Sequence, residues 1–117
     1  MPYIDFNLSA KLVDKKEETL KYETAQLMKK IAGKDESWLY IRFNTHQSLY
    51  FKGDPMKNGA LIEIKLVGNL SSGQKKELSV AMGRLLEDEL GIHPDEMYLI
   101  ITEVKGENWG WNGQTFG

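Results

Sequence analysis

The chain has 117 residues, of which 41% are hydrophobic and 27% charged, and its formal net charge is −2. This length suits one domain with a substantial core, and the slightly acidic charge gives no electrostatic case for binding nucleic acid or an anionic membrane. The absence of cysteine excludes disulfides, thiolate metal sites and cysteine nucleophiles. The chain shows no signal-peptide pattern and no apolar run long enough to cross a bilayer. We therefore expect a soluble, cytoplasmic protein, and export that needs no signal peptide stays open.

The first segment, residues 1–8, alternates apolar and polar side chains and predicts a half-buried strand. Its second residue is Pro2. Removal of Met1, which is usual before a small second residue, would leave a secondary amine at the head of this strand. Apolar surroundings would disfavour the protonated amine and suit it to act as a general base near neutral pH. The structural alternative is that Pro2 only begins a strand, where a missing N–H is harmless, and the N-terminus taken alone favours that alternative.

The next segment predicts an amphipathic helix. A capping-box pattern of Asp14 and Glu17 precedes it, and Gly33 suits the left-handed C-cap position at its end. The apolar side chains spaced along its expected buried face are Leu20, Leu27, Met28 and Ile31. After this helix, residues 38–43 predict a strand, residues 44–46 a turn, residues 48–51 a short strand and residues 52–59 a loop.

The second half of the chain repeats the first at an offset of 58 residues, the separation of Gly33 from Gly91. The offset places residues 4–8 on residues 62–66, and it places the first helix on a second one with its own capping box of Ser71 and Gln74. The apolar face of this second helix is expected to contain Leu78, Met82, Leu85, Leu86 and Leu90. The alternative is chance matching of common apolar residues, and the unbroken register across strand, helix, glycine and strand favours a true repeat.

Two tandem β-α-β units predict the fold class. Half-repeats of about 2–44 and 60–104 would form a single domain over residues 1–117, in an α/β (α+β) fold with a four-stranded mixed sheet and both helices on one face. The other face would carry polar residues such as Asp5 and Glu63, and an uncovered sheet of this kind favours self-association.

The C-terminal segment, residues 107–117, predicts a hairpin, because Asn112-Gly113 is a strong signal for a two-residue turn. Large aromatic side chains are unusual in such a polar, glycine-rich tail, and they need a surface to pack on, in this domain, in another subunit or on a ligand. These aromatic residues are Trp109, Trp111 and Phe116.

Together these features resemble the macrophage migration inhibitory factor family of the tautomerase superfamily. The matching features are Met1-Pro2 at the head of a strand, Gly33-Lys34 after the first helix, residues 64–68 leading to Ser71, residues 94–98 entering the last long strand, and the tail at residues 109–116. The resemblance spans the whole chain, and the tail together with the N-terminal proline makes it specific. It implies a homotrimer with a barrel-like centre and active sites between subunits. It also implies keto–enol tautomerisation of phenylpyruvate-like 2-oxo acids without a cofactor.

The resemblance also implies a role for each matching residue. Pro2 would take a proton from the carbon beside the ketone and return it at the enol stage. Lys34 would face the substrate carboxylate, the main-chain N–H of Val67 would donate a hydrogen bond to the substrate, and Tyr98 would line the pocket from the adjacent subunit. Without the resemblance, Lys34 would be a solvated lysine beside a helix end and Tyr98 an ordinary strand tyrosine. The remaining side chains expected to contact the substrate are Tyr3, Trp38, Trp111 and Phe116.

The chain departs from the family pattern at a few positions. Ile100 stands where cytokine-type members have an asparagine near the base, and Trp109 stands where valine is frequent. The Cys-x-x-Cys pair of some members is absent, which excludes a thiol–disulfide activity. His46 and His93 lie in separate loop-like segments without the spacing of metal ligands, so we expect surface histidines and no metal site.

Two other interpretations stay open. One is a cytokine-like or other protein-binding trimer with a vestigial pocket, although nothing in the sequence supports a receptor as partner. The other is a ferredoxin-like binding module, which has the same β-α-β-β-α-β order of elements and would be a monomer with a disordered tail. No RNA-binding signature with basic and aromatic strand motifs is present.

Overall fold

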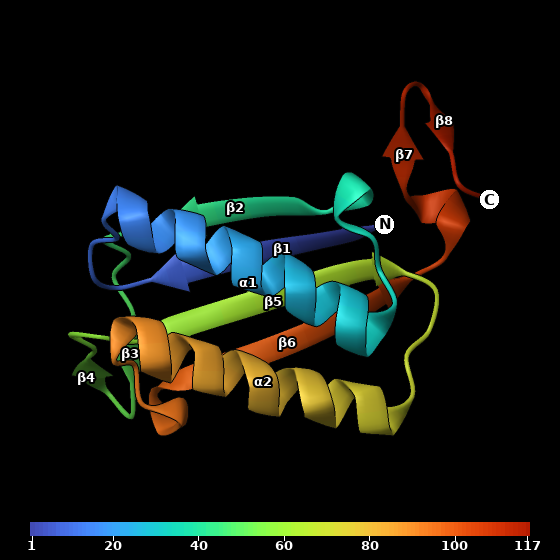
Figure 1. Ribbon diagram of the computed structural model, residues 1–117. Helices are drawn as coiled ribbons and strands as arrows, with labels where there is room; N and C mark the ends of the chain where they lie inside the picture. Colours follow the sequence, from blue (N-terminus) through green and yellow to red (C-terminus); the bar gives the residue numbers. More distant parts are fainter.

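The computed structural model describes residues 1–117, and its central element is a four-stranded mixed sheet (Figure 1). The strands lie in the order β2 (Tyr40–Asn44), β1 (Pro2–Leu8), β5 (Ala60–Val67) and β6 (Met97–Val104). β1 is parallel to β2, and β5 is parallel to β6, whereas β1 and β5 are antiparallel. The crossover helices α1 (Asp14–Ala32) and α2 (Ser72–Leu90) cover the same face of the sheet. The predicted fold class is therefore confirmed.

Short elements connect and extend this frame. Single 3₁₀ turns precede β2, β6 and the C-terminal hairpin, and they are η1 (Glu36–Trp38), η2 (Pro94–Glu96) and η3 (Gly106–Asn108). Two small hairpins pair β3 (Tyr50–Phe51) with β4 (Asp54–Pro55) and β7 (Gly110–Trp111) with β8 (Gln114–Thr115). The second hairpin turns at Asn112-Gly113 as predicted, with φ angles of 52° and 74°. It projects from one end of the sheet, next to the N-terminus (Figure 1). No helix combines the length and the apolar character needed to cross a membrane.

The 58-residue repeat is visible in the structure as two equivalent strand–helix–turn–strand units. α1 and α2 each contain 19 residues, and their first residues stand at equivalent positions of the repeat. Gly33 and Gly91 end these helices with the same φ of 67°, in the left-handed region that favours glycine. The predicted capping box of Ser71 and Gln74 is present at the start of α2.

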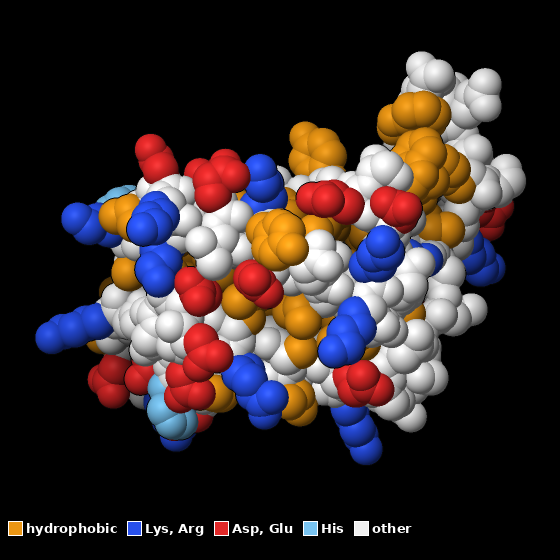
Figure 2. Space-filling view, in the orientation of Figure 1, with side chains coloured by type: hydrophobic (Ala, Val, Ile, Leu, Met, Phe, Trp, Pro, Cys, Tyr) orange, Lys and Arg blue, Asp and Glu red, His pale blue; other side chains and the backbone are white.

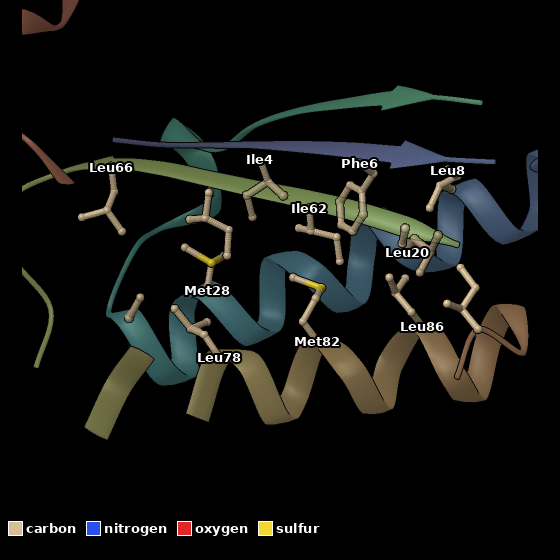
Figure 3. Packing of buried hydrophobic residues seen from close by; sticks show 14 of the residues in the cluster. Ile4, Phe6, Leu8, Leu20, Met28, Ile62, Leu66, Leu78, Met82 and Leu86 are labelled. Atoms are coloured by element: carbon tan, nitrogen blue, oxygen red, sulfur yellow. The ribbon is translucent and has the colours of Figure 1, made fainter. Parts of the chain in front are cut away.

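The core lies between the sheet and the two helices (Figure 3). Alternation along β1 and β5 points every second side chain at the helices, and these side chains are fully or almost fully buried. The strand residues in question are Ile4, Phe6, Leu8, Ile62, Ile64 and Leu66, and the helices contribute Leu20, Met28, Leu78, Met82 and Leu86. Full burial of one such side chain contributes about 1.5–3 kcal/mol. This core therefore holds β1, and with it the N-terminal end of the chain, in a defined register.

The start and the buried face of α1 differ from the sequence prediction. The N-cap is Val13, whose side chain makes no cap hydrogen bond, and Asp14 is already helical. The predicted capping box is wrong because Asp14 and Glu17 both lie in the first turn, where their charges favour the positive end of the helix. Thr24 is fully buried in this face, whereas Leu27 is half-buried in the outer groove between the two helices.

The strand predicted at residues 38–43 begins at Tyr40. Trp38 belongs instead to η1, because the Asp35 carboxylate accepts the Ser37 N–H at 3.0 Å and stabilises a 3₁₀ turn there. The residues predicted as a loop after β3 also contain β4, which pairs with β3. The η1 turn directs Trp38 toward the C-terminal hairpin, where the centroid of the Trp111 ring lies 5.0 Å away.

The face of the sheet without helices carries a hydrogen-bonded polar network. The β1–β2 register sets Asp5 against Arg42. Arg42 donates to both Asp5 carboxylate oxygens at 3.0 Å, and Asn44 donates to one of them at 2.8 Å. These contacts leave Asp5 only 5% exposed. The hydrogen bonds from Arg42 hold the pKa of the Asp5 carboxyl below its ordinary value, because they stabilise the ionised form.

Candidate active site

A cleft of about 330 Å³ opens at the N-terminal end of β1, between this strand, η1 and the C-terminal hairpin. Its lining residues are Met1, Pro2, Tyr3, Ser37, Trp38, Leu39, Tyr40, Trp109, Trp111 and Phe116. The cleft thus brings together most of the site residues predicted from the sequence, which are Pro2, Tyr3, Trp38, Trp111 and Phe116.

Three aromatic rings form one wall of the cleft. The centroid of the Trp38 ring lies 5.0 Å from that of Trp111 and 6.1 Å from that of Phe116, edge to face with both. Hydrophobic side chains accordingly gather on the hairpin at the upper right of Figure 2. Edge-to-face pairs add about 0.5–1.5 kcal/mol each beyond burial. The aromatic tail therefore packs on its own domain, and 55% exposure of Trp111 still leaves apolar surface for a ligand.

The base of the hairpin is held by close main-chain contacts. The Phe116 N–H donates to the Gly106 carbonyl at 3.1 Å and to the Trp109 carbonyl at 3.2 Å. A Cβ atom at Gly106 would lie 2.5 Å from the Phe116 carbonyl oxygen. A side chain at position 106 would therefore force the end of the hairpin, which carries Phe116, to shift.

Pro2 is buried at the head of β1, where its missing N–H leaves no donor unpaired. Its nitrogen is joined to Met1, so the free amine of the chain is that of Met1. Burial, and to a smaller extent the positive charge of Lys34, lower the pKa of the Met1 amine below its ordinary value of 8.0. The environment at this end of β1 therefore disfavours a protonated amine.

Lys34 and Val67 lie directly beside the N-terminal residue. The Val67 N–H donates to the Met1 carbonyl oxygen at 3.3 Å, and the Lys34 ammonium donates to the Val67 carbonyl at 3.0 Å. β5 ends here, because Gly68 adopts a φ of 105° while its N–H still bonds the Val104 carbonyl at 3.2 Å. Val67 thus connects the two groups, because its N–H binds the Met1 carbonyl and its carbonyl accepts from the Lys34 ammonium.

Tyr98 is the one predicted site residue that lies far from Pro2 in the same chain. Pro2 on β1 pairs with Leu66 of β5, whereas Tyr98 on β6 pairs with Leu61 of the same strand. Five residues along a strand correspond to about 17 Å. Tyr98 is 61% exposed, and its ring contacts the Phe51 ring at a centroid distance of 5.7 Å. A single chain therefore does not bring Tyr98 to its own Pro2.

Tyr40 lines the cleft but is absent from the residues predicted from the sequence. Its ring meets that of Tyr3 edge to face at a centroid distance of 5.7 Å. No local pattern indicates it, because its place in the cleft comes from the parallel register of β1 and β2, which pairs Tyr3 with Tyr40. The pKa of the Tyr3 phenol is raised, first by burial and then by the negative charge of Asp5. Tyr3 therefore stays a neutral hydrogen-bonding group in the cleft.

The sequence matches the family model described as Macrophage migration inhibitory factor (MIF) over residues 1–117. A macrophage migration inhibitory factor homolog of Trichinella spiralis is 29% identical over 116 residues, which cover 99% of this chain and 100% of the relative. The crystal structure of a macrophage migration inhibitory factor homologue from Prochlorococcus marinus superposes with a TM-score of 0.89 at 27% identity. That superposition covers 98% of this chain and 99% of the other.

Two more distant structures share the fold. One is that of Pt0534 inactivated by 2-oxo-3-pentynoate, with a TM-score of 0.87 at 14% identity over 97% of this chain and 94% of the other. The other is described as an R7 fused 4-OT wild-type asymmetric trimer, with a TM-score of 0.84 at 14% identity and the same coverage of both chains.

Proposed function

The chain belongs to the macrophage migration inhibitory factor family, and on that premise we propose that it catalyses keto–enol tautomerisation of phenylpyruvate-like 2-oxo acids. The base in this proposal is Pro2 with a free N-terminal nitrogen. The observation that carries the proposal is the position of Pro2, buried at the head of β1 beside Lys34, the Val67 N–H and an aromatic wall. Removal of Met1 is required, because an amide nitrogen cannot accept the proton.

The surroundings of Pro2 favour a neutral amine. Burial and the charge of Lys34 already lower the pKa of the Met1 amine. A prolyl amine one residue further into the strand would experience the same two effects. A larger fraction of it would then be unprotonated near neutral pH, as the first proton transfer needs.

The position vacated by Met1 suits a substrate oxygen. The Val67 N–H would lose the Met1 carbonyl as its acceptor, and the Lys34 ammonium lies beside it. These two donors would bind the carboxylate and the adjacent ketone oxygen of a 2-oxo acid. The substrate ring would lie against Trp38, Trp111 and Phe116 and exclude water from the amine.

The reaction moves one proton and leaves the oxidation state unchanged. The neutral Pro2 nitrogen takes a proton from the carbon beside the ketone, and the electrons of that C–H bond form the carbon–carbon double bond. The ketone π electrons move to oxygen, where the Val67 N–H and Lys34 stabilise the developing negative charge. The prolinium then returns the proton to this oxygen, which gives the enol and restores the neutral amine.

We also infer a homotrimer in which Tyr98 reaches the cleft of a neighbouring subunit. Tyr98 and Ile100 are exposed on β6, at 61% and 45%, and Tyr98 lies too far from Pro2 to serve its own chain. The inactivated Pt0534 and the trimeric 4-OT structure support a 2-oxo acid as ligand and a trimer as assembly.

The test is a phenylpyruvate tautomerase assay on protein whose intact mass shows that Met1 is gone. We expect Pro2→Ala to lower kcat/KM by about 100-fold or more, the contribution of a positioned general base. Pro55→Ala, in the exposed strand β4, is the matched control and should stay within about twofold of the unmodified protein. Absence of turnover in correctly processed protein would contradict the proposal and favour a protein-binding trimer with a vestigial pocket.

A further inference from the structure

The chain contains the dipeptide Asn-Gly twice, at Asn58-Gly59 and at Asn112-Gly113. This dipeptide deamidates readily, because glycine has no side chain to hinder attack of its main-chain nitrogen on the asparagine amide. The deprotonated nitrogen bonds to the side-chain carbonyl carbon and ammonia leaves. Water then opens the resulting succinimide to aspartate or isoaspartate. Since the dipeptide is the same at both places, the difference in rate between them depends on the structure.

The structure holds Asn58-Gly59 in an unreactive arrangement. The Gly59 N–H donates to the Ser9 hydroxyl at 2.7 Å, and the Asn58 side-chain amide donates to the Leu90 carbonyl at 3.2 Å. Gly59 is buried, and Asn58 is half-buried, immediately before β5. Both reacting groups are therefore bound to other partners, and the glycine nitrogen is shielded from the hydroxide that must deprotonate it.

Asn112-Gly113 has none of these restraints. The Asn112 side chain and the Gly113 N–H form no hydrogen bond, and both residues are exposed at the turn between β7 and β8 (Figure 1). A Cβ atom added at Gly113 would meet nothing within 4 Å, so the space around this residue is open. Each strand of the hairpin has only two residues, all of them exposed. Such a hairpin opens locally at a small cost in free energy, which lets the succinimide ring close.

The same turn supports the aromatic wall of the cleft. Trp111 directly precedes Asn112, and its ring centroid lies 5.0 Å from that of Trp38 and 6.5 Å from that of Phe116. Isoaspartate carries the main chain through its side-chain carbon, which lengthens the backbone of the turn. Because the pairing of Trp111 with Gln114 requires a two-residue loop, the longer backbone disrupts that pairing. Deamidation also places a carboxylate next to the Trp111 ring.

We propose that Asn112 is a site of spontaneous deamidation that displaces Trp111 from the wall of the cleft, whereas hydrogen bonds protect Asn58. The isoaspartyl product is a substrate for enzymes that methylate isoaspartyl carboxylates. The modification does not depend on what the cleft does, and only the accompanying loss of turnover rests on the proposed tautomerase function.

The experiment incubates the intact protein at mildly alkaline pH and follows the tryptic peptides 58–65 and 106–117 by mass spectrometry. We expect Asn112 to convert at least about tenfold faster than Asn58, because ring closure at Asn58 must first break two hydrogen bonds. Fragmentation separates Asn112 from Asn108, and methyl transfer by an isoaspartyl methyltransferase identifies the isoaspartyl product. Equal conversion of Asn112 and Asn58, or an Asn112 that stays intact, would overturn the proposal.

Two variants test why the two asparagines differ. Ser9→Ala removes the oxygen that binds the Gly59 N–H, and it should speed conversion of Asn58 at least about threefold without changing that of Asn112. An unchanged rate at Asn58 would show that this hydrogen bond gives no protection. Asn112→Gly keeps a dipeptide that suits the turn and has no amide to lose. Its tryptophan emission should stay constant during the incubation, and a drift equal to that of the unmodified protein would count against the proposal.

A further comparison isolates the effect on the wall. Asn112→Asp has the new charge on an ordinary main chain, in a conformation that aspartate tolerates. We expect the purified isoaspartyl protein to differ in tryptophan emission and to lose at least about threefold in kcat/KM for phenylpyruvate, whereas Asn112→Asp keeps the emission of the unmodified protein. Unchanged emission in the isoaspartyl form would refute the displacement of Trp111. Altered emission without turnover in any form would support the displacement and contradict the tautomerase function instead.

Discussion

The main-chain N–H of Val67 donates to the carbonyl oxygen of Met1 at 3.3 Å, so the first peptide group of the chain fills the position in which we expect a substrate oxygen. Protein that retains Met1 should therefore lack both the base and the oxygen site. We expect its kcat/KM for phenylpyruvate to be at least about 100-fold below that of processed protein. The measurement compares two preparations, one made with methionine aminopeptidase inhibited, after intact mass has identified each. Equal activity in the two forms would contradict the role of Pro2.

The distance between Pro2 and Tyr98 predicts complementation between subunits. Homo-oligomers of Pro2→Ala and of Tyr98→Ala should each have low activity, because every site lacks one component. Unfolding and refolding the two variants together should restore part of the activity, since some sites then combine an intact Pro2 with an intact Tyr98 from a neighbour. Activity that never exceeds the mean of the separate variants would indicate that Tyr98 is not shared between subunits.

The ion pair of Asp5 and Arg42 predicts resistance to acid. The pKa of the Asp5 carboxyl lies below its ordinary value of 3.8 in the folded protein. The pair therefore stabilises the fold above about pH 4, and this stabilisation is lost as the pH falls through the folded pKa. Arg42→Gln should move the midpoint of acid unfolding, followed by circular dichroism, to higher pH. Arg84→Gln removes an exposed arginine without an ion pair and should leave the midpoint in place.

The close contact at Gly106 predicts that the aromatic wall is sensitive to one methyl group. Gly106→Ala would place a Cβ atom 2.5 Å from the Phe116 carbonyl oxygen, so the end of the hairpin must shift. We expect a loss of about 1–3 kcal/mol in the free energy of unfolding and a change in tryptophan emission. Gly110→Ala meets only an ordinary contact of 3.5 Å and serves as the control. Similar effects of both substitutions would show that helix and turn propensity, not this contact, decides the outcome.

The two short hairpins predict opposite effects of exchanging their turn residues. Lys52 and Asn112 occupy the same left-handed conformation, with φ angles of 54° and 52°. Asparagine tolerates this conformation, whereas a lysine in it lowers the free energy of unfolding by about 1 kcal/mol. At Lys52 the contact of the ammonium group with the Phe51 ring offsets about 0.5 kcal/mol of that loss. Lys52→Asn should raise the free energy of unfolding by about 0.5 kcal/mol, and Asn112→Lys should lower it by about 1 kcal/mol. Denaturant unfolding checks both, and changes of the same sign would refute the argument.

Much of the fold could be predicted from the sequence, because the residue patterns that specify its helices and strands are local and occur once in each half of the chain. Gly33 and Gly91 end their helices as expected, and alternation along β1 and β5 correctly separates core from open face. The η1 turn could not be predicted, because the aromatic run from Trp38 continues the pattern of a strand. The Asp35 side chain decides the conformation there through one hydrogen bond.

The site is less accessible to sequence reasoning than the fold. Pro2, Trp38 and Phe116 could be grouped only through a family resemblance, since nothing in their spacing indicates that they meet. Tyr40 was missed because its position depends on the pairing of β1 with β2, which no local pattern specifies. The roles of Lys34 and of the other matching residues remain predictions, which the substitutions above can test.

If the equal lengths and equal C-caps of α1 and α2 reflect an ancient gene duplication, the ancestor had two equivalent corners, one at the start of the first strand of each half. Only the corner at the start of a polypeptide can ever expose a free imino nitrogen, however faithfully the other is copied. The internal corner was then free to drift, and alanine and glutamate now stand where the terminal corner keeps proline and tryptophan. Fusion of the halves would thereby have given a protein in which only one of the two ends can carry a free prolyl amine.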